Sequence, residues 1–487
     1  MPSAPWRAAA CVAGAALLTS CADVRSLSPA AAAVSSRATA AGEADVCHKP
    51  GDGGRILGID LPALAGHRAH GDYVSTLYVS HQAEPSDDGV HFTTISAALA
   101  SAAASRAAAG ELVAGACRIT IVVSPGIYQG TVGTVSGALE HFPLIVDVPD
   151  VTLRGALVME LDANGRATGQ STTGEETVLT PVEPLPFVDL LSTPIIIANA
   201  HPGGSAGNGL VVEGFVFQSG NLPLAAPGGG QAVLTLRATD VTIRGNRVEG
   251  GFTESFDLRA GSGQVIENHL SGTAGTCDVC LAGPGTYGAR GNRLLAGGIP
   301  GIGATPLVNL AVPPGVEPYV LPATAEVWVD IRNNEVRDHQ RTPVGVGIRM
   351  DAVGVGAPNV HGSVHAVVQD NLVVNNRFGM IVHAAFPVAN TLRRGDVELT
   401  LGGNVFQGTC EANLYVAFSR HTFGLGLPTN SVRLQNSTFR LTLKGDVGWD
   451  EAWFFHPAGL GNTLVVDGTE IPNGVRQFYD AVGCPAS

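Results

Sequence analysis

The sequence predicts an all-β protein, a right-handed parallel β-helix in which short strands wind around one axis. Three observations predict this fold. Glycine accounts for 63 of the 487 residues, short segments alternate apolar and polar residues, and one six-residue phrase recurs along the chain. Only 14% of the residues are charged, and helical bundles and coiled coils are disfavoured because they need Glu, Lys and Leu where this sequence has Gly, Val, Thr and Asn.

The recurring phrase is an apolar residue, two residues of any kind, an asparagine, one residue of any kind and a second apolar residue. Its asparagines are Asn246, Asn268, Asn292, Asn334, Asn371 and Asn404, with a displaced copy at Asn436 and an earlier one that carries Phe215 instead. The first two spacings are 22 and 24 residues and the later ones 32 to 42, as expected for one coil with or without an inserted loop, or for two coils. We expect the asparagines to form a hydrogen-bonded ladder at a corner between strands, where asparagine also tolerates a left-handed backbone.

The remaining elements follow from local patterns. Residues 151–153, 241–243, 327–331 and 397–401 are β-branched and alternate with period two, which predicts strands. Residues 92–109 are rich in alanine and have apolar residues at helical spacing, which predicts a helix that caps the open end of the solenoid. Asn164-Gly165 predicts a hairpin within a long excursion over residues 156–207.

The N-terminal residues have the pattern of an export signal. Residues 1–20 contain Arg7 followed by an apolar stretch, and the segment Leu18-Thr-Ser-Cys21 resembles the lipobox of bacterial lipoproteins. That resemblance implies a lipid (palmitate) on Cys21, a membrane anchor, and delivery to the bacterial cell envelope, at the outer membrane in a Gram-negative cell. The alternative is an ordinary secretory signal with a chance cysteine. The predicted organisation is then a flexible tether over 21–45, the β-helix with its cap over 46–440 and a C-terminal cap or tail over 441–487.

Six further cysteines in an exported chain predict disulfides. We expect Cys47 to pair with Cys117 and Cys410 with Cys484, whereas Cys277-x-x-Cys280 leaves redox or zinc chemistry as a minor alternative. The sequence shows no spacing typical of metal ligands, so neither a metal nor a cofactor is predicted. The net charge of −14 excludes nucleic acid as a partner.

Acidic residues in the central coils are the candidates for chemistry. Asp257 and Asp278 are 21 residues apart, close to one coil of 22, which would make them neighbours, and Glu254 is the alternative partner. Two adjacent carboxylates push their pKa values apart and provide one acid and one base or nucleophile. The competing interpretation is that these side chains are solvated or belong to corners of the coil.

A second group of polar residues falls at similar distances past the asparagines. Arg259, Arg349, Asp351 and His383 lie 13, 15, 17 and 12 residues after their respective asparagines, which predicts a shared face. On such a face arginine would neutralise the carboxylate of a uronic acid, and histidine or arginine would take the adjacent proton. Structural ion pairs are the alternative.

Several segments resemble the pectin-lyase-like β-helix superfamily and, within it, the pectinesterases. Phe92-Thr-Thr-Ile95 and Pro125-Gly-Ile-Tyr128 resemble the opening of that superfamily, and Gln231-Ala-Val233 resembles a substrate-binding motif of the pectinesterases. Thr253-Glu254 stands where those enzymes have Gln-Asp, and the segment around Asp278 resembles the motif of their nucleophile. The sequence departs from the family in having Thr253 for glutamine and in lacking the late Leu-Gly-Arg-Pro-Trp motif.

Together these patterns predict a membrane-anchored, exported β-helix lipoprotein that binds or acts on carbohydrate. The alternative is a pectinesterase-like esterase, or a uronic-acid lyase, that uses a carboxylate pair on adjacent coils. A purely structural or adhesive envelope protein is the third hypothesis.

Overall fold

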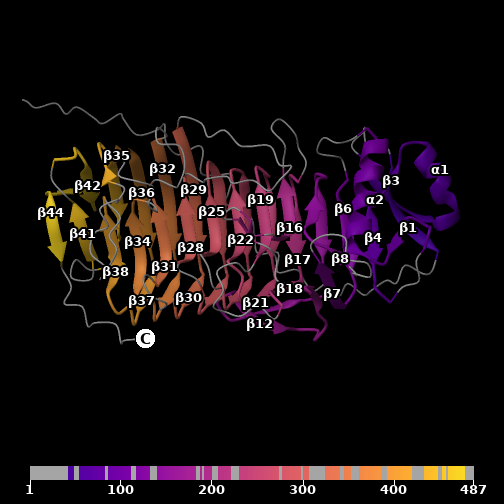
Figure 1. The fold of residues 1–487 in the computed structure, drawn as a ribbon, viewed down its shortest axis with the longest axis horizontal. Coiled ribbons are helices and arrows are strands. Elements are labelled where there is room, and N and C mark those ends of the chain that lie inside the picture. The colour runs from indigo at the N-terminus through magenta and orange to yellow at the C-terminus, as the bar shows by residue number, and fades with distance from the viewer. Residues whose placement is uncertain are drawn as a thin grey trace, which may run out of the picture.

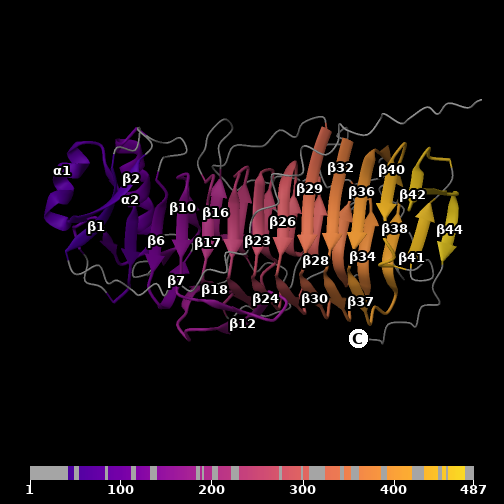
Figure 2. The same ribbon diagram turned by 180° about the vertical axis from the view of Figure 1, so that it is seen from behind.

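Stacked coils of parallel strands form an elongated solenoid, with the N-terminal cap at one end and the last coils at the other (Figures 1 and 2). The structure is a computed structural model. It describes residues 42–48, 54–82, 86–110, 117–131, 140–182, 187–188, 191–192, 194–199, 207–220, 230–273, 277–297, 300–306, 324–339, 345–352, 361–384, 392–418, 433–447, 452–456 and 459–477.

Three long sheets make the walls of the solenoid, and we number them 1 to 3. Sheet 1 contains β4 (Thr76–Val79), β5 (His91–Phe92), β6 (Ile119–Val123), β10 (Val151–Arg154), β17 (Val211–Glu213), β20 (Val241–Arg244), β23 (Ser262–Ile266), β26 (Gly285–Arg290), β29 (Thr324–Arg332), β32 (His361–Gln369), β36 (Gly395–Gly402), β40 (Thr438–Thr442), β42 (Thr463–Val466) and β43 (Thr469–Ile471). Sheet 2 contains β7 (Gly126–Thr131), β8 (Glu140–His141), β13 (Thr177–Pro181), β18 (Phe215–Gln218), β21 (Arg247–Glu249), β24 (His269–Ser271), β27 (Arg293–Leu295), β30 (Glu335–Arg337), β33 (Leu372–Val374) and β37 (Val405–Gln407).

Sheet 3 carries the residues of the candidate site. It contains β9 (Leu144–Val146), β16 (Pro194–Asn199), β19 (Gln231–Leu236), β22 (Glu254–Arg259), β25 (Cys277–Ala282), β28 (Pro300–Thr305), β31 (Val346–Asp351), β34 (Phe378–His383), β38 (Ala412–Ala417), β41 (Ala452–His456) and β44 (Gly474–Gln477). Smaller sheets pair β1 (Glu43–His48) with β2 (Arg55–Asp60) and β3 (Tyr73–Val74), β11 (Met159–Leu161) with β12 (Ala167–Ser171), β14 (Phe187–Val188) with β15 (Leu191–Ser192), and β35 (Leu392–Arg393) with β39 (Arg433–Leu434).

One coil visits the three sheets in turn. The chain passes from β20 in sheet 1 to β21 in sheet 2 and β22 in sheet 3, and then returns to sheet 1 at β23, which pairs with β20 in parallel. The predicted right-handed parallel β-helix is therefore confirmed. Its interior is filled by alternate side chains of each strand, as in β29, where Val327, Val329 and Ile331 are buried between exposed neighbours.

The predicted asparagine ladder runs along the corner between sheets 1 and 2. Asn268 donates from Nδ2 to Asn292 Oδ1 at 3.0 Å, and Asn292 donates to Asn334 Oδ1 at 2.9 Å. The ladder begins where the Phe215 amide donates to Asn246 Oδ1, and it ends where Asn404 donates to Asp446 Oδ2. The side-chain bonds satisfy backbone groups that would otherwise be buried without partners.

The left-handed backbone at this corner belongs to a different residue from the one predicted. The residue before each ladder asparagine has positive φ, for example Glu267 at 55° and Asp370 at 55°. The displaced copy near the C-terminus does not belong to the ladder. Asn436 has a φ of 52° and lies before β40, where the amide of the following Ser437 donates to Asn462 Oδ1, whereas the ladder position after β40 is held by Asp446.

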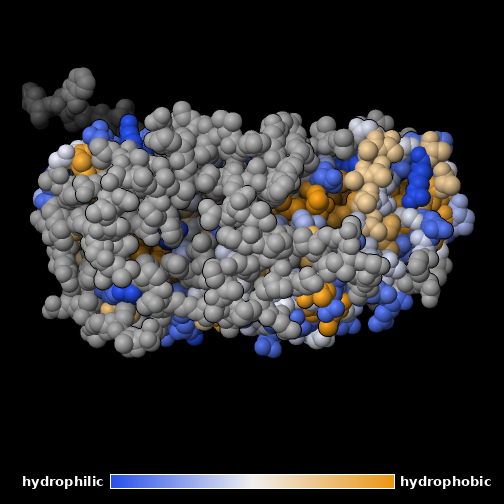
Figure 3. Space-filling view, in the orientation of Figure 1, coloured by the Kyte–Doolittle hydropathy of each residue, from blue (hydrophilic) through white to orange (hydrophobic). Residues whose placement is uncertain are grey.

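The N-terminal cap contains the predicted helix. Helix α2 (Ile95–Ala108) begins after Thr94, whose hydroxyl accepts a hydrogen bond from the Ala97 amide at 3.2 Å. A shorter helix, α1 (Leu64–Ala69), follows a 3-10 turn over Leu61–Ala63. The cap end shows pale hydrophobic patches beside hydrophilic ones, since α2 is largely alanine (Figure 3). The predicted Cys47–Cys117 disulfide is present and joins β1 to the segment before β6.

The predicted hairpin is also present, as the antiparallel pair β11 and β12. It lies along sheet 2 (Figures 1 and 2), where Arg247 donates to the carbonyl of Gly169 in β12. Near the C-terminus the parallel coils continue past residue 440 to β42, and antiparallel pairing begins only with β43 and β44.

Several predictions concern residues outside the described parts of the chain. The signal segment, the tether up to residue 41, Cys21 and Cys484 all lie there, so the proposed lipid site and the Cys410–Cys484 pair remain predictions. Across the parts that the structure describes, no helix is long and apolar enough to span a membrane.

Candidate functional site

The candidate residues lie on the outward side of sheet 3. In β22 the third and fifth residues, Phe256 and Leu258, belong to the buried interior. The fourth and sixth residues, Asp257 and Arg259, therefore point away from it, because side chains alternate along a strand. The same fourth and sixth positions hold Arg349 and Asp351 in β31, and the sixth holds His383 in β34. The predicted shared face for the arginines, Asp351 and His383 is confirmed by this register.

Four predicted residues meet in one group, which we call the carboxyl cluster: Gln231, Glu254, Asp257 and Arg259. Gln231 Nε2 donates to Asp257 Oδ2 at 2.8 Å and also to Glu254 Oε2. Arg259 Nε donates to the same Asp257 oxygen at 2.7 Å, and its Nη2 reaches Glu254 Oε2 at 3.3 Å. The strand pairing causes this contact, because Gln231 in β19 stands directly beside Glu254 in β22.

The carboxyl cluster holds two carboxyl groups but one arginine. Burial raises the pKa of Asp257 to about 8, and although Arg259 opposes this shift, the negative charge of Glu254 adds to it. The carboxyl of Asp257 therefore keeps its proton at neutral pH. Burial alone would lower the pKa of Arg259, but the charges of Asp257 and Glu254 outweigh it and raise that pKa. The arrangement supplies a proton donor beside a second carboxyl group.

Two buried oxygen atoms of the cluster accept no hydrogen bond from the described residues. They are Oδ1 of Asp257 and Oε1 of Gln231, and both residues are only 1% exposed. Buried polar atoms are nearly always paired, so an unpaired couple in one cluster indicates a place where another polar molecule binds. Glu254, with 13% of its side chain exposed, is the member that solvent reaches most easily.

The expected pairing of Asp257 with Asp278 is wrong. The register sets Cys280 beside Asp257, and Asp278 falls at the second position of β25, between the paired Cys277 and Val279. Its carboxylate is fully buried and lies 2.9 Å from Nε2 of the equally buried His339, which follows β30. Asp278 is thus a member of a buried corner contact between sheets 2 and 3, whereas Glu254, the alternative partner, is the carboxyl group that meets Asp257.

Cys277 and Cys280 form a disulfide within β25. Cys277 stands beside Glu254 and Cys280 beside Asp257, so the disulfide borders the carboxyl cluster. The two sulfurs of a disulfide are not thiolates, so Cys277 and Cys280 are not metal ligands in this state.

The second predicted group lies further along the same face. Asp351 is 3.0 Å from Nη2 of Arg349 and 2.8 Å from Nε2 of His383, and we call these three residues the arginine-histidine cluster. Burial alone would raise the pKa of Asp351, but the charges of Arg349 and His383 outweigh burial and hold that pKa below its ordinary value. The pairing of β31 with β34 places Asp351 directly beside His383.

The two clusters are separated by a short distance along the solenoid. The strands run in the order β22, β25, β28 and β31, and at about 4.8 Å for each step the clusters are about 14 Å apart. Between them lie the Cys277–Cys280 disulfide and the small residues Gly303 and Thr305 of β28. A linear polymer that follows the solenoid axis could contact both clusters at once.

Comparisons with known proteins found only distant structural likenesses. No family model and no curated protein matches the chain. The A-module of mannuronan C-5 epimerase AlgE4 from Azotobacter vinelandii is a similar solved structure, with a TM-score of 0.42 and 13% identity over 83% of this chain and 98% of that one. DFA-IIIase from Arthrobacter chlorophenolicus A6 gives 0.41 and 11% over 81% of this chain and 94% of that one. An exopolygalacturonase from Thermotoga maritima gives 0.32 and 9% over 73% and 87%. Likenesses this distant carry no argument about activity, and the fold itself is read from the strand pairing of this chain.

Proposed function

We propose that the protein binds a polysaccharide containing uronic acids along the outward side of sheet 3 and acts on it at the carboxyl cluster. The observation that carries the proposal is the pair of carboxyl groups, Glu254 and Asp257, which share hydrogen-bond donors from Gln231 and Arg259. Such a pair provides a proton donor beside a base or nucleophile, as hydrolysis of an ester or of a glycosidic bond requires. In this proposal Asp257 donates the proton and Glu254 is the ionised partner.

The charges on the same face favour an acidic polymer. Arg259 is charged within the carboxyl cluster, and about 14 Å further along the solenoid Arg349 adds a second cationic group, beside His383, at the position where a bound chain would continue. Carboxylates of a uronic acid bind arginine in a bidentate manner, which fixes the orientation of each sugar. The unpaired Asp257 Oδ1 and Gln231 Oε1 are available to sugar hydroxyl groups.

The small exposed fraction of Asp257, 1%, favours a second candidate function, which is binding without turnover. A carboxyl group held so far from solvent can organise a binding surface through Gln231 and Arg259 and take no part in chemistry. The two functions differ in what the loss of one carboxyl group would do, because a binding role predicts weaker affinity and a catalytic role predicts slower turnover with affinity retained.

The test uses the chain without residues 1–21 on pectin and on alginate. Methanol release, new reducing ends and absorbance of an unsaturated product are followed together with the affinity for each polymer. We expect Glu254→Gln and Asp257→Asn to lower turnover by about 100-fold or more while the polymer still binds. The control is Glu213→Gln, which removes a carboxylate paired with two arginines on sheet 1 and should leave turnover unchanged. Absence of both turnover and binding in the unsubstituted chain would overturn both candidates.

We further propose that the protein is exported and held at a bacterial membrane by a lipid on Cys21. The lipobox-like segment Leu18-Thr-Ser-Cys21 supports this proposal. So do the Cys47–Cys117 and Cys277–Cys280 disulfides, because disulfides persist mainly in oxidising compartments outside the cytosol. Labelling cells with a radioactive palmitate should mark the protein and place it in the membrane fraction, and Cys21→Ser should abolish both results. Palmitate-free protein in the soluble fraction before any substitution would contradict the anchor.

A further inference from the structure

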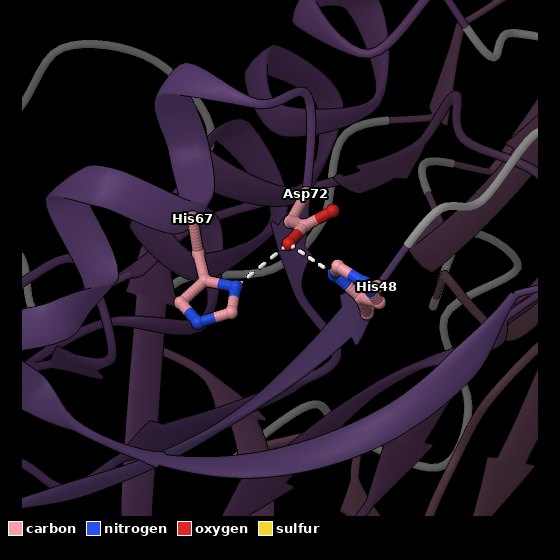
Figure 4. Close-up of side chains that lie close together, drawn as sticks. All are labelled: His48, His67 and Asp72. Atoms are coloured by element: carbon pink, nitrogen blue, oxygen red, sulfur yellow. Dashed lines mark hydrogen bonds and ion pairs between the residues drawn. The ribbon is translucent and has the colours of Figure 1, made fainter.

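Two histidines and an aspartate converge in the N-terminal cap, far along the solenoid from the carboxyl cluster. Asp72 Oδ2 lies 2.8 Å from Nδ1 of His48 and 2.7 Å from Nδ1 of His67 (Figure 4). The three residues come from different elements. His48 ends β1, His67 lies in α1, and Asp72 precedes β3.

We propose that these three residues form a binding site for a divalent transition-metal ion, with Zn²⁺ as the ion that they fit best. One ligand atom from each residue lies within 4.8 Å of the other two. Zinc held at about 2.0–2.1 Å by imidazole nitrogen needs neighbouring ligand atoms about 3.3 Å apart, so small movements of the side chains would admit the ion. Imidazole nitrogen favours zinc, copper and nickel, whereas calcium and magnesium need oxygen ligands.

The geometry of the rings fits an ion that would replace the two hydrogen bonds to Asp72. The two imidazole rings meet edge to face, with their planes at 77° and their centroids 5.9 Å apart, and both turn Nδ1 toward the same carboxylate oxygen. An ion that displaces the protons of these two hydrogen bonds would meet two imidazole nitrogens and one carboxylate oxygen, with the fourth tetrahedral position left for water.

Access and anchoring are also suitable. The His48 and His67 side chains are 29% and 26% exposed, so an ion can enter from solvent, while Asp72 is held inside the cap with 1% exposed. His67 and Asp72 are tied by a backbone hydrogen bond from the Asp72 amide to the His67 carbonyl. His48 directly follows Cys47, whose disulfide to Cys117 fixes the end of β1. The ion would join three segments of the cap that the disulfide alone does not connect.

Zinc titration of the disulfide-bonded chain without a histidine tag tests the proposal. After treatment with a chelator and its removal, isothermal calorimetry with ZnCl2 should show one ion per chain, and CaCl2 should show none at this site. We expect His67→Ala and Asp72→Asn each to weaken zinc binding at least 10-fold, since each removes one of three ligands. The matched control is His91→Ala. His91 also bonds an aspartate through Nδ1, at 2.7 Å from Asp88, but only one histidine meets that carboxylate.

The outcomes separate the site from other zinc ligands. Zinc binding that is equally strong in His67→Ala and in the unsubstituted chain would overturn the proposal, and so would an equal loss in His91→Ala. X-ray absorption on the zinc-loaded, unsubstituted chain needs no variant to fold. The spectrum should show two imidazole nitrogens and oxygen as zinc ligands. Sulfur ligands would instead place the ion at Cys277 and Cys280 and would also overturn the proposal.

Discussion

Removal of one asparagine from the middle of the ladder should destabilise the solenoid strongly. Asn292→Ala deletes four side-chain hydrogen bonds. Nδ2 donates to the Val265 carbonyl and to Asn334 Oδ1, and Oδ1 accepts from the amide and from Nδ2 of Asn268. The Asn268 side chain keeps two carbonyl partners, and Asn334 Oδ1 keeps the Asn292 amide. Two buried backbone groups, the Asn268 amide and the Val265 carbonyl, are left without these partners.

A buried polar group that loses its partner costs about 1–3 kcal/mol, so two such groups lower the free energy of unfolding by about 2–6 kcal/mol. Urea unfolding followed by circular dichroism gives the change, and hydrogen exchange of the Asn268 amide locates it. The control is Asn164→Ala at the exposed hairpin, which should change the free energy of unfolding by less than about 0.5 kcal/mol. If Asn292→Ala and Asn164→Ala unfold at the same urea concentration, the ladder does not stabilise the fold as argued.

Three further predictions concern stability. Because the pKa of Asp257 is raised, the folded chain binds more protons than the unfolded one between about pH 4 and pH 8, and this residue should make the protein less stable as the pH rises through that window. Thermal melts at several pH values should show a smaller decline for Asp257→Asn. Gly261→Ala should lower the melting temperature clearly more than Gly288→Ala, because the new Cβ at Gly261 would lie 2.0 Å from the Ala238 carbonyl oxygen, whereas at Gly288 it meets only the end of the flexible Gln264 side chain. Equal melting temperatures would contradict the close backbone approach at Gly261. Replacing Cys47 and Cys117 together by serine should lower the free energy of unfolding by about 2–4 kcal/mol, since the disulfide closes a loop of 70 residues, and an unchanged urea midpoint would show that the bond does not constrain the cap.

The fold could be predicted because its signals are local and repeated. Each asparagine phrase marks one corner, and the strand after it alternates with period two, so the repeat itself specifies stacked coils. The same reasoning placed the left-handed backbone one residue too late. The asparagine in the ladder directs its side chain along the stack of coils. The left-handed backbone belongs to the residue just before it, for example Glu267 before Asn268.

The candidate site was predicted in part. Four of the predicted residues meet because β22 and its neighbour β19 carry all of them, namely Gln231, Glu254, Asp257 and Arg259. The Asp278 pairing is wrong because Asn246 and Asn268 are 22 residues apart, whereas the register of sheet 3 pairs Glu254 with Cys277, one residue further along. A shift of two residues, as here, changes which side chains are neighbours, and a shift of one would also change the side of the sheet that they face.

Contacts between distant parts of the chain left no trace in the sequence pattern. His339 reaches Asp278 only because two sheets meet at a corner, and His48 reaches His67 and Asp72 only through the folding of the cap. Neither set has the short, regular spacing by which a ligand motif is found in a sequence. Such constellations become visible only when the elements are placed in space.

A crystal structure of Glu254→Gln with an oligomer of galacturonic acid would show whether sheet 3 binds the polymer. We expect the sugar chain to lie along the outward side of sheet 3, with one unit at Gln231 and Asp257 and a later unit near Arg349 and His383. An oligomer bound on sheet 1, for example at the exposed Trp328 that stacks on His365, would contradict the claim, as would a structure in which the oligomer does not bind.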